Sequence, residues 1–232
     1  MRNIFCVVLL LFGVTVFSAG DNILEEVEIE GAKAELSYAF GMLFAEDLVD
    51  IGFEFDYYAF ILGFRAKMEK QDTIYTMDEA IEIIDTAFSA VQAQRGERNR
   101  VEATEFLTEN GKRPEVNVTP SGLQYEVISE GTGEVPGPDD MVLVHYRGTT
   151  IDGAVFDTTY ERGAPVEIPL ERVIPGWSEG LRMMREGGQA RLYIPSDLAY
   201  GEWGAGAIGP NSVIIFDVEL LAIVRSQIFA DD

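Results

Sequence analysis

The hydrophobic residues divide the chain into two parts with different periods. Between residues 34 and about 113 they recur at intervals of three and four, which is the spacing of amphipathic helices. Beyond Val116 they alternate with polar residues, which is the pattern of half-buried strands. We therefore expect an α+β protein with an all-helical N-terminal part and an antiparallel sheet in its C-terminal part.

The helical part is predicted to begin with two short helices that are rich in aromatic residues. The first covers residues 36–45, and the second begins after Asp56, a candidate N-cap, and runs to Met68. The aromatic residues of these two helices and of the segment between them are Tyr38, Phe40, Phe44, Phe53, Phe55, Tyr57, Tyr58, Phe60 and Phe64. Because a monomeric core of about 60 residues cannot easily bury so many rings, we expect a second copy of the chain to cover them, with residues 34–90 as the dimerisation surface. The alternative is a self-contained core of three helices.

A third, long helix is predicted to connect the two parts. Thr76 and Glu79 have the spacing of a capping box, in which two side chains satisfy free backbone N–H groups at the start of a helix. No proline follows before Pro114, so the helix would continue to Gly111, a length of about 35 residues or roughly 50 Å. Its second half, residues 92–105, is polar nearly all round, and such a stretch usually crosses solvent between domains.

The C-terminal part is predicted to be an antiparallel sheet with one helix laid on it. Clusters of glycine and proline separate the alternating stretches, which are residues 123–128, 142–146, 190–194 and 213–224. One short helix fits between them, from Trp177 through Leu181 to Met184.

The first twenty residues have the features of a secretory signal peptide. Arg2 precedes a hydrophobic run over residues 4–17, and small residues stand before a cleavage site after Gly20. The run is short for a membrane span of about 20 residues, although an uncleaved anchor is the alternative. The only cysteine, Cys6, lies in this run, so the mature protein would contain no thiol. This fits export to a bacterial periplasm, and association with the outer membrane or the cell surface stays open.

The expected organisation therefore has three parts. Residues 1–20 form the signal peptide, residues 21–113 form a helical dimerisation domain that includes the long connecting helix, and residues 114–232 form the sheet domain.

The charge of the chain argues against some partners. The 40 acidic and 17 basic residues give a net charge of −23, which repels phosphate backbones and anionic lipid head groups. Nucleic acid is therefore not an expected partner. The simplest account of the charge is a solvated coat that keeps the protein in solution.

The residue content also argues against several kinds of active site. The single histidine, His145, lies in a predicted strand with no nucleophile motif nearby, so we expect a structural or solvent-facing role for it. A zinc site is not expected without cysteines in the mature chain, and the sequence has no EF-hand loop, Walker loop or dinucleotide-binding fingerprint. We therefore expect no metal and no cofactor.

The remaining candidates for chemistry are hydrophobic and aromatic residues of the sheet part. They are Tyr146, Phe156, Trp177, Tyr200 and Phe216, with Val173, Ile174 and Ile208. Such residues ordinarily form the core of a small sheet domain, which is a sufficient account of Phe216 alone. Trp177 differs because it begins a helix, where its ring can form the floor of a cavity. Tyr200 differs because it lies in a glycine-rich loop, where a tyrosine is more often a contact residue.

These residues stand in motifs that resemble the FKBP family of peptidyl-prolyl cis–trans isomerases. In family order, the motifs are Val144-His145-Tyr146-Arg147-Gly148, Phe156-Asp157-Thr158-Thr159, Val173-Ile174-Pro175-Gly176-Trp177, Ile194-Pro195 with Ala199-Tyr200-Gly201, and Ile215-Phe216-Asp217-Val218-Glu219-Leu220-Leu221. The helical part is similar to the N-terminal domain of macrophage infectivity potentiator-type members, through Ser37-Tyr38-Ala39-Phe40-Gly41, Phe55-Asp56-Tyr57 and Gly63-Phe64-Arg65. This resemblance implies a dimer of intertwined helices in which a long helix carries each isomerase domain.

The resemblance also implies a role for each residue of the site. The catalytic residues implied are Tyr146, Asp157, Tyr200 and Phe216. The substrate-binding residues implied are Phe156, Val166, Val173, Ile174, Trp177 and Ile208. Trp177 would form the floor of a proline-binding pocket. The Ile174 backbone N–H and the Tyr200 hydroxyl would donate hydrogen bonds to substrate carbonyls, and the Tyr146 hydroxyl would hold Asp157 at the edge.

Two positions depart from the commonest family pattern. Val166 stands where many members have a phenylalanine, which would open one wall of the pocket. Trp203 occupies a position that is usually polar, and it is either a packed loop residue or an added contact for unfolded chains.

Two functions of different kinds fit these features. One is a dimeric, periplasmic prolyl isomerase that acts on unfolded or proline-containing polypeptides and is sensitive to macrolides of the FKBP class. The other is a chaperone or surface binding protein in which turnover is incidental, since two arms around a cleft can hold one chain with avidity. A purely structural dimer is a third reading.

Overall fold

The computed structural model of the chain describes residues 29–49 and 52–224. The predicted signal peptide, with Cys6, lies outside these residues. The chain divides into two compact units between Glu54 and Phe55. Of the described helices, α1 (Ala32–Val49) belongs to the first unit, and all the other elements belong to the second. The expected domain boundary at residue 113 stays a prediction.

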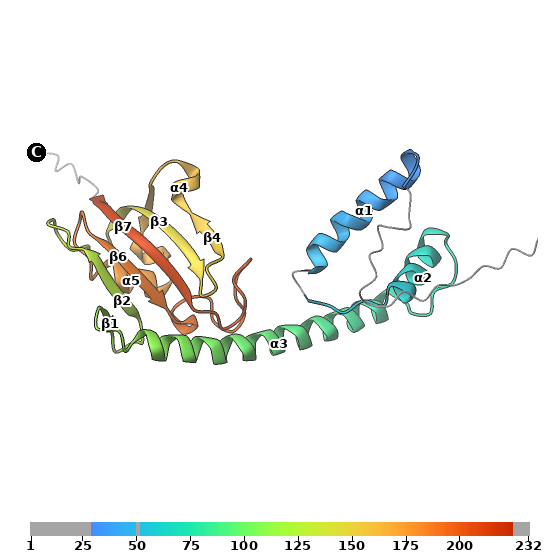
Figure 1. Cartoon of the computed structure of the whole chain (residues 1–232), viewed down its shortest axis with the longest axis horizontal. Helices are drawn as coiled ribbons and strands as arrows, with labels where there is room; N and C mark the ends of the chain where they lie inside the picture. The colour runs from blue at the N-terminus through green and yellow to red at the C-terminus, as the bar shows by residue number, and fades with distance from the viewer. Residues whose placement is uncertain (1–28, 50–51, 225–232) are drawn as a thin grey trace, which may run out of the picture. The chain divides into compact units, whose positions relative to one another are not determined.

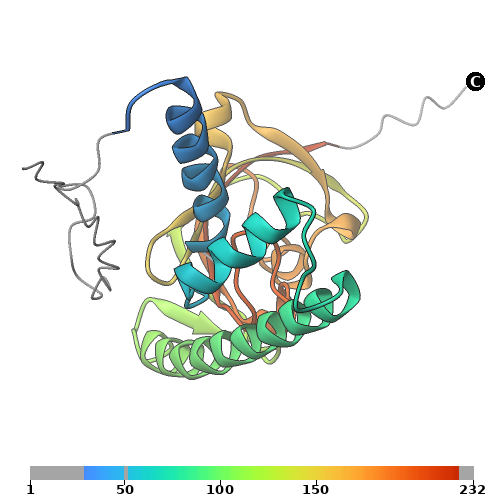
Figure 2. The same cartoon turned by 90° about the vertical axis from the view of Figure 1, so that its right-hand side faces the viewer.

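The three predicted helices of the N-terminal part are confirmed. After α1, the second unit contains α2 (Tyr57–Met68) and α3 (Met77–Asn110). The Asp56 carboxylate caps α2 by accepting a hydrogen bond from the backbone N–H of Ala59 at 3.0 Å. Thr76 and Glu79 form the predicted capping box of α3. Both views show α3 as one unbroken helix, and it has 34 residues (Figures 1 and 2).

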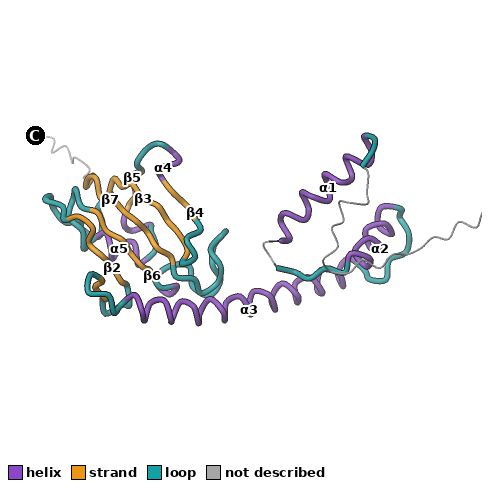
Figure 3. The backbone as a smooth tube through the Cα atoms, in the orientation of Figure 1, coloured by secondary structure: helices purple, strands orange, loops and turns teal. Residues whose placement is uncertain are grey.

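Seven antiparallel strands form one sheet in the described part of the chain (Figure 3). They are β1 (Val116–Val118), β2 (Gln124–Ser129), β3 (Met141–Thr150), β4 (Val155–Thr158), β5 (Val166–Pro169), β6 (Gln189–Ile194) and β7 (Ile214–Val224). Their order is β1–β2–β6–β7–β3–β4, and β5 also pairs with β3. The predicted strands β2, β3, β6 and β7 are confirmed. Alternation does not reveal β1, β4 and β5, because each has only three or four residues.

β3 is the strand on which the rest of the sheet is assembled. One of its edges pairs with β7 over the whole length of β3. Its other edge pairs with β5 near its start and with β4 near its end. Alternate residues of β3 from Val142 to Gly148 and of β7 from Ile214 to Leu220 are buried, and all of them except Gly148 belong to one hydrophobic core.

One short helix, α5 (Pro175–Leu181), contributes Trp177 and Leu181 to this core. It ends at Leu181 rather than at the predicted Met184, because the chain turns there and the backbone N–H of Met184 donates to the Leu181 carbonyl at 3.1 Å. Met184 is buried in the core all the same. The unit also contains smaller helical turns. They are α4 (Thr159–Arg162) and the 3-10 helices η2 (Leu170–Arg172) and η3 (Ser196–Leu198).

The polar composition of the C-terminal half of α3 suggests that it crosses solvent. In the structure it lies against the sheet part instead. Its buried and half-buried residues recur at helical spacing, from Gly96 through Asn99, Ala103 and Phe106 to Asn110. The Phe106 ring lies 5.9 Å from that of Tyr193. The expectation was wrong because this contacting face is made mostly of small and polar residues, so its periodicity does not show in the hydrophobic pattern.

Buried amide groups join the end of this helix to β2. The Gln124 side chain donates to the Leu107 carbonyl at 2.8 Å and accepts from the Asn110 amide at 2.9 Å. Gln124 and Asn110 are both more than nine-tenths buried. Their partners therefore satisfy groups that would be costly to bury alone.

A glycine at the start of α5 is required for its close contact with β6. A Cβ atom on Gly176 would lie 2.3 Å from Cγ2 of Ile194, which is itself fully buried. We expect Gly176→Ala to lower the free energy of unfolding by about 1–3 kcal/mol through overpacking, measured by urea unfolding of the full chain. Gly137→Ala is the matched control, because its Cβ would meet only ordinary contacts with Asp140. Equal unfolding midpoints for the two variants would contradict this account.

Candidate active site

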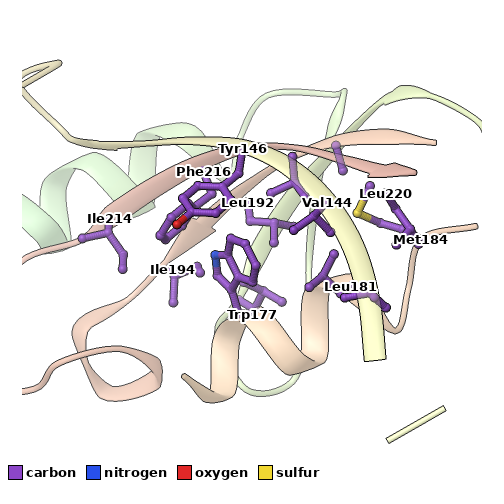
Figure 4. Close-up of a cluster of buried hydrophobic side chains, with 14 of the residues drawn as sticks. Val144, Tyr146, Trp177, Leu181, Met184, Leu192, Ile194, Ile214, Phe216 and Leu220 are labelled. Carbon is purple, nitrogen blue, oxygen red and sulfur yellow. The ribbon is translucent and has the colours of Figure 1, made fainter. Parts of the chain in front are cut away.

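Four aromatic rings from four elements meet in the core of the sheet part. Tyr146 of β3, Trp177 of α5 and Phe216 of β7 are each more than nine-tenths buried, and Phe156 of β4 is half-buried beside them. The Trp177 ring centre lies 5.0 Å from the centres of both Tyr146 and Phe216, and Phe156 lies 5.4 Å from Phe216. All these pairs pack edge to face, which is a favoured geometry for aromatic rings. Figure 4 shows the Trp177 indole extending from its helix towards Tyr146 and Phe216.

A glycine in β3 makes this meeting of rings sterically feasible. Gly148 is paired with Phe216 across the sheet. A Cβ atom on Gly148 would lie 2.7 Å from the Phe156 ring and 2.8 Å from the Phe216 ring. The Tyr146-Arg147-Gly148 sequence therefore places one ring of the cluster and leaves the space for two others.

Trp177 has an unusual feature for a core residue. Its indole N–H is buried, and it has no hydrogen-bond partner among the described residues. Buried donors without a partner are rare in proteins because desolvation is costly. The cluster therefore contains a donor without a partner in the described part of the chain, at the residue that the resemblance implies as the floor of a pocket.

A charged pair lies beside the Tyr146 hydroxyl. Tyr146 donates a hydrogen bond to the Asp157 carboxylate, as the resemblance implies, and Arg162 of α4 forms an ion pair with the same carboxylate. Arg162 also donates to the Tyr146 hydroxyl oxygen at 3.0 Å, and its guanidinium lies 5.6 Å from the centre of the Tyr146 ring. The sequence analysis missed Arg162, although a basic residue shortly after Phe156-Asp157-Thr158-Thr159 in so acidic a chain was an available signal.

These contacts determine the ionisation of the group. Burial alone would raise the pKa of the Asp157 carboxyl, but the hydrogen bonds from Tyr146 and Arg162 outweigh it and hold the pKa below its usual value. Burial and the neighbouring carboxylate raise the pKa of the Tyr146 hydroxyl. At neutral pH the group therefore consists of a carboxylate, a guanidinium and a protonated phenol.

Two buried threonines fix the backbone of Tyr146. The Thr159 hydroxyl accepts from the Tyr146 N–H at 2.9 Å and also lies 3.1 Å from the Tyr146 carbonyl, to which Thr158 donates at 3.2 Å. Thr159 also contacts Nδ1 of His145 at 2.8 Å, and the His145 ring stacks on Tyr160. His145 thus has structural partners, as expected of a lone strand histidine.

The other predicted site residues lie around the cluster to different degrees. Ile208 is buried in the core with the aromatic rings. Val166, Val173 and Ile174 are half-buried and pack against this core. The Tyr200 side chain is 37% exposed, and it follows Ala199, which packs against the core.

Trp203 is 83% exposed. The alternative in which this ring is packed into its loop is therefore wrong. The exposed ring is available as a contact for another molecule.

Hollows elsewhere on the surface involve none of these residues. One of about 550 Å³ lies along the N-terminal half of α3, and one of about 390 Å³ is lined by residues 105–113. The described residues contain no group of three or more histidine, cysteine, aspartate or glutamate side chains that could hold a metal ion. The aromatic cluster with its charged edge is the candidate site for chemistry because it brings together four of the predicted rings and the Asp157 carboxylate.

Two family models cover the described chain almost from end to end. Residues 133–221 match the model of FKBP-type peptidyl-prolyl cis-trans isomerase. Residues 33–127 match the model of the domain amino terminal to FKBP-type peptidyl-prolyl isomerase. The first match includes every residue of the aromatic cluster, and the second includes α2, α3 and all of α1 except its first residue, Ala32.

Individual proteins agree with the family models over most of their length. The chain is 41% identical to the FKBP-type 22 kDa peptidyl-prolyl cis-trans isomerase of Escherichia coli, over 83% of this chain and 96% of that protein. It is 40% identical to the probable FKBP-type peptidyl-prolyl cis-trans isomerase FkpA of Neisseria meningitidis, over 82% of this chain and 74% of that protein. It is 34% identical to the outer membrane protein MIP of Legionella longbeachae, over 84% and 87%.

A solved structure shows the same architecture. The crystal structure of FkpA from Escherichia coli covers 84% of this chain, and 98% of that chain is covered in return, with a TM-score of 0.63 and 32% sequence identity. The helical region followed by the antiparallel sheet and short helix is common to both. The chain therefore belongs to the FKBP-type peptidyl-prolyl cis–trans isomerases, with the amino-terminal domain of the macrophage infectivity potentiator-like class.

Proposed function

We propose that the aromatic cluster binds the proline ring of an Xaa-Pro segment and isomerises the preceding amide. Trp177 forms the floor and Tyr146, Phe156 and Phe216 form the walls. The rim residues are Val166, Val173, Ile174 and Ile208. The observation that carries this assignment is the edge-to-face packing of four rings, one of which is the Trp177 indole with a buried N–H that has no partner among the described residues. In this proposal the site acts through hydrophobic rings and dipolar groups.

Such a site suits the twisted form of the amide. Rotation about an Xaa-Pro bond takes tens to hundreds of seconds without a catalyst, because resonance gives the C–N bond double-bond character. The twisted amide has lost that resonance and much of its polarity, so transfer to an apolar site costs it less than it costs the planar amide. A site that binds the twisted form better than the planar form lowers the barrier. The Ile174 N–H and the Tyr200 hydroxyl would hold the flanking carbonyls.

Asp157 acts in this proposal as an oriented charge and transfers no proton. Its pKa lies below the usual value, so the carboxylate is ionised and is a poor base at neutral pH. Tyr146 and Arg162 fix its direction at the edge of the cluster. Rotation about a C–N bond needs no proton transfer, which fits the absence of a histidine from the cluster.

Two substitutions test the assignment of the residues. We expect Asp157→Leu to lower kcat/KM by about tenfold and Tyr200→Phe to lower it by about three- to tenfold, the range of one hydrogen bond. The measurement is isomerisation of a short Xaa-Pro peptide, with and without an FKBP-type macrolide. Circular dichroism should show that both variants fold. Asp139→Leu is a control at an exposed position, and Tyr125→Phe is a control at a tyrosine of β2 that packs against the same hydrophobic core but is not one of the four rings. Wild-type rates in both site variants would refute the site.

The ionisation of the charged group predicts the pH dependence. Because the pKa of folded Asp157 lies below the unfolded value of about 3.9, its bonds to Tyr146 and Arg162 stabilise the fold at higher pH. They are lost as the pH falls through the folded value. We therefore expect kcat/KM to be flat between about pH 5 and pH 8, measured with uncharged peptides. A bell-shaped profile in this range would show proton transfer and contradict the proposal.

We propose further that the helical part forms a homodimer that holds unfolded chains. In the single chain, α2 contains no buried residue, although it is made largely of aromatic and aliphatic side chains. Phe64 is 60% exposed, and Ile81 of α3 is 51% exposed. Apolar surface of this extent is unfavourable in water and is typical of an interface. A second copy is the expected partner because the resemblance of this region to macrophage infectivity potentiator-type members implies a dimer of intertwined helices, and the matched amino-terminal family model covers the same region.

Substitutions that introduce charge on the apolar surface of α2 test the isomerase and chaperone functions separately. We expect the double substitution Phe60→Glu and Phe64→Glu to give a monomer by sedimentation, since the two stacked rings lie on the exposed surface of α2. Turnover of a short peptide should be unchanged. Protection of an unfolded protein from aggregation should fall, because avidity is lost. Lys67→Glu, exposed on the same helix, is the control for the added charge. A double variant that stays dimeric would contradict the assigned interface.

The first twenty residues and the name of one relative favour an exported protein. Residues 1–20 would direct it to the periplasm as a signal peptide, and one relative is named as an outer membrane protein. No helix among the described residues is long and apolar enough to cross a membrane. Exported proteins with proline would be the clients, and macrolides of the FKBP class would compete for the aromatic cluster.

A further inference from the structure

The loop between η3 and β7 contributes two residues to the proposed site. Tyr200 stands at its start, and Ile208 is buried in the core near its end. The loop folds back on itself, since Gly204 donates to the Tyr200 carbonyl at 3.2 Å and Ala205 pairs with Ile208. Its glycines, at positions 201, 204, 206 and 209, give it a backbone with much conformational freedom. Other parts of the structure must therefore hold it in one conformation.

The long helix α3 supplies this support through hydrogen bonds of two asparagines, Asn99 on the helix and Asn211 in the loop. The side chain of Asn99 donates to the Pro210 carbonyl at 2.8 Å and to the Ser212 hydroxyl at 3.3 Å. In the opposite direction, the side chain of Asn211 donates to the Gly96 carbonyl at 3.1 Å. The helix and the loop are thus joined by three hydrogen bonds between groups more than 100 residues apart in sequence.

Asn211 also links the helix to the position of Tyr200. Its backbone N–H donates to the Gly201 carbonyl at 2.9 Å, next to Tyr200. Its backbone has a φ of +55°, a left-handed conformation that asparagine tolerates better than most residues. One residue therefore connects α3, through its side chain, to the catalytic end of the loop, through its main chain.

The close approach of helix and loop requires small residues on both sides. A Cβ atom on Gly96 would lie 3.2 Å from the Asn211 amide nitrogen and 3.4 Å from Pro210. A Cβ atom on Gly209 would lie 2.9 Å from the Asn99 amide nitrogen and 3.1 Å from Nε of Arg95. The contact is therefore tightly packed as well as hydrogen-bonded.

We propose that Asn99 and Asn211 are positioning residues for isomerisation, which hold the loop so that Tyr200 and Ile208 face the bound Xaa-Pro segment. This inference rests on the proposed function of the aromatic cluster. It makes the C-terminal half of α3 a working part of the active site in addition to a connection between the two halves of the chain. Neither asparagine touches the aromatic rings, so they act on the reaction only through the loop.

The role predicts a particular kinetic signature. The rings that bind proline in the proposed function belong to β3, β4, α5 and β7, which lie outside the loop, so we expect them to keep their positions when the loop is loosened. The Tyr200 donor, by contrast, must hold a carbonyl while the amide twists. Loss of the hydrogen bonds of Asn99 or Asn211 between helix and loop should therefore lower kcat by about two- to tenfold, the range of one or two hydrogen bonds. It should leave KM within about twofold of the wild-type value.

The test uses three variants of the full chain. Asn99→Ala removes the amide of α3 and with it both hydrogen bonds, to Pro210 and to Ser212. Asn99→Asp keeps the shape of the side chain but places a carboxylate against the Pro210 carbonyl. Asn211→Gly removes the bond to Gly96 while it suits the left-handed backbone. Glu102→Ala, exposed on α3, is the control. We would measure kcat and KM for a short Xaa-Pro peptide, and the folded fraction by urea unfolding.

The expected result is a lower kcat, with little change in KM, in all three variants and wild-type values in Glu102→Ala. Wild-type kcat in the three variants would overturn the inference, and so would a loss of activity that only follows the folded fraction. An inactive wild-type chain would instead refute the proposed function, because it requires turnover at the aromatic cluster itself.

Discussion

The pairing of β3 with β7 is the constraint on which the rest of the sheet part depends. It places Tyr146 and Phe216 on the same side of the sheet, and the absence of a side chain at Gly148 lets the rings approach. The other edge of β3 holds β5 at one end and β4, with Phe156, at the other. A shift of one residue by either strand would turn the ring of that strand to the other face and so separate it from the ring of its partner strand. The geometry of the cluster is therefore a property of the strand pairing, and the loops only complete it.

The polar edge of the cluster shows how charge is kept near an apolar site. A carboxylate beside four rings would be costly to desolvate if it were alone. The Arg162 guanidinium and the Tyr146 hydroxyl offset this cost, and the carboxylate keeps partial contact with water, since its side chain is 39% exposed. The result is a fixed dipolar group at the rim of a hydrophobic surface. Such preorganised groups stabilise a changing charge distribution without reorganising during the reaction.

Sequence reasoning identified the long strands, the helices and the aromatic rings because each repeats over several residues or stands in a specific motif. It missed β1, β4 and β5 because three or four residues are too few to show a period. It missed Arg162 because the partner of Asp157 is set by the turn after β4 and not by a pattern. It misjudged the polar half of α3, where Asn99 and Asn110 are interface residues, because hydrophobicity does not distinguish a docked polar face from a solvated one.

The two halves of α3 therefore solve different problems with different residues. The N-terminal half exposes large apolar side chains such as Ile81, for which water is an unfavourable neighbour, so it requires a cover. The C-terminal half contacts the sheet and the loop before β7 mainly through amides, a glycine and backbone carbonyls, whose hydrogen bonds have direction, and also through the Phe106 ring. Apolar contact supplies free energy for association but tolerates small shifts, whereas amide-to-carbonyl bonds contribute less and fix a position. Hydrogen bonds between amides and carbonyls therefore suit the C-terminal end of the helix, where, in the inference above, the glycine-rich loop is held in one position.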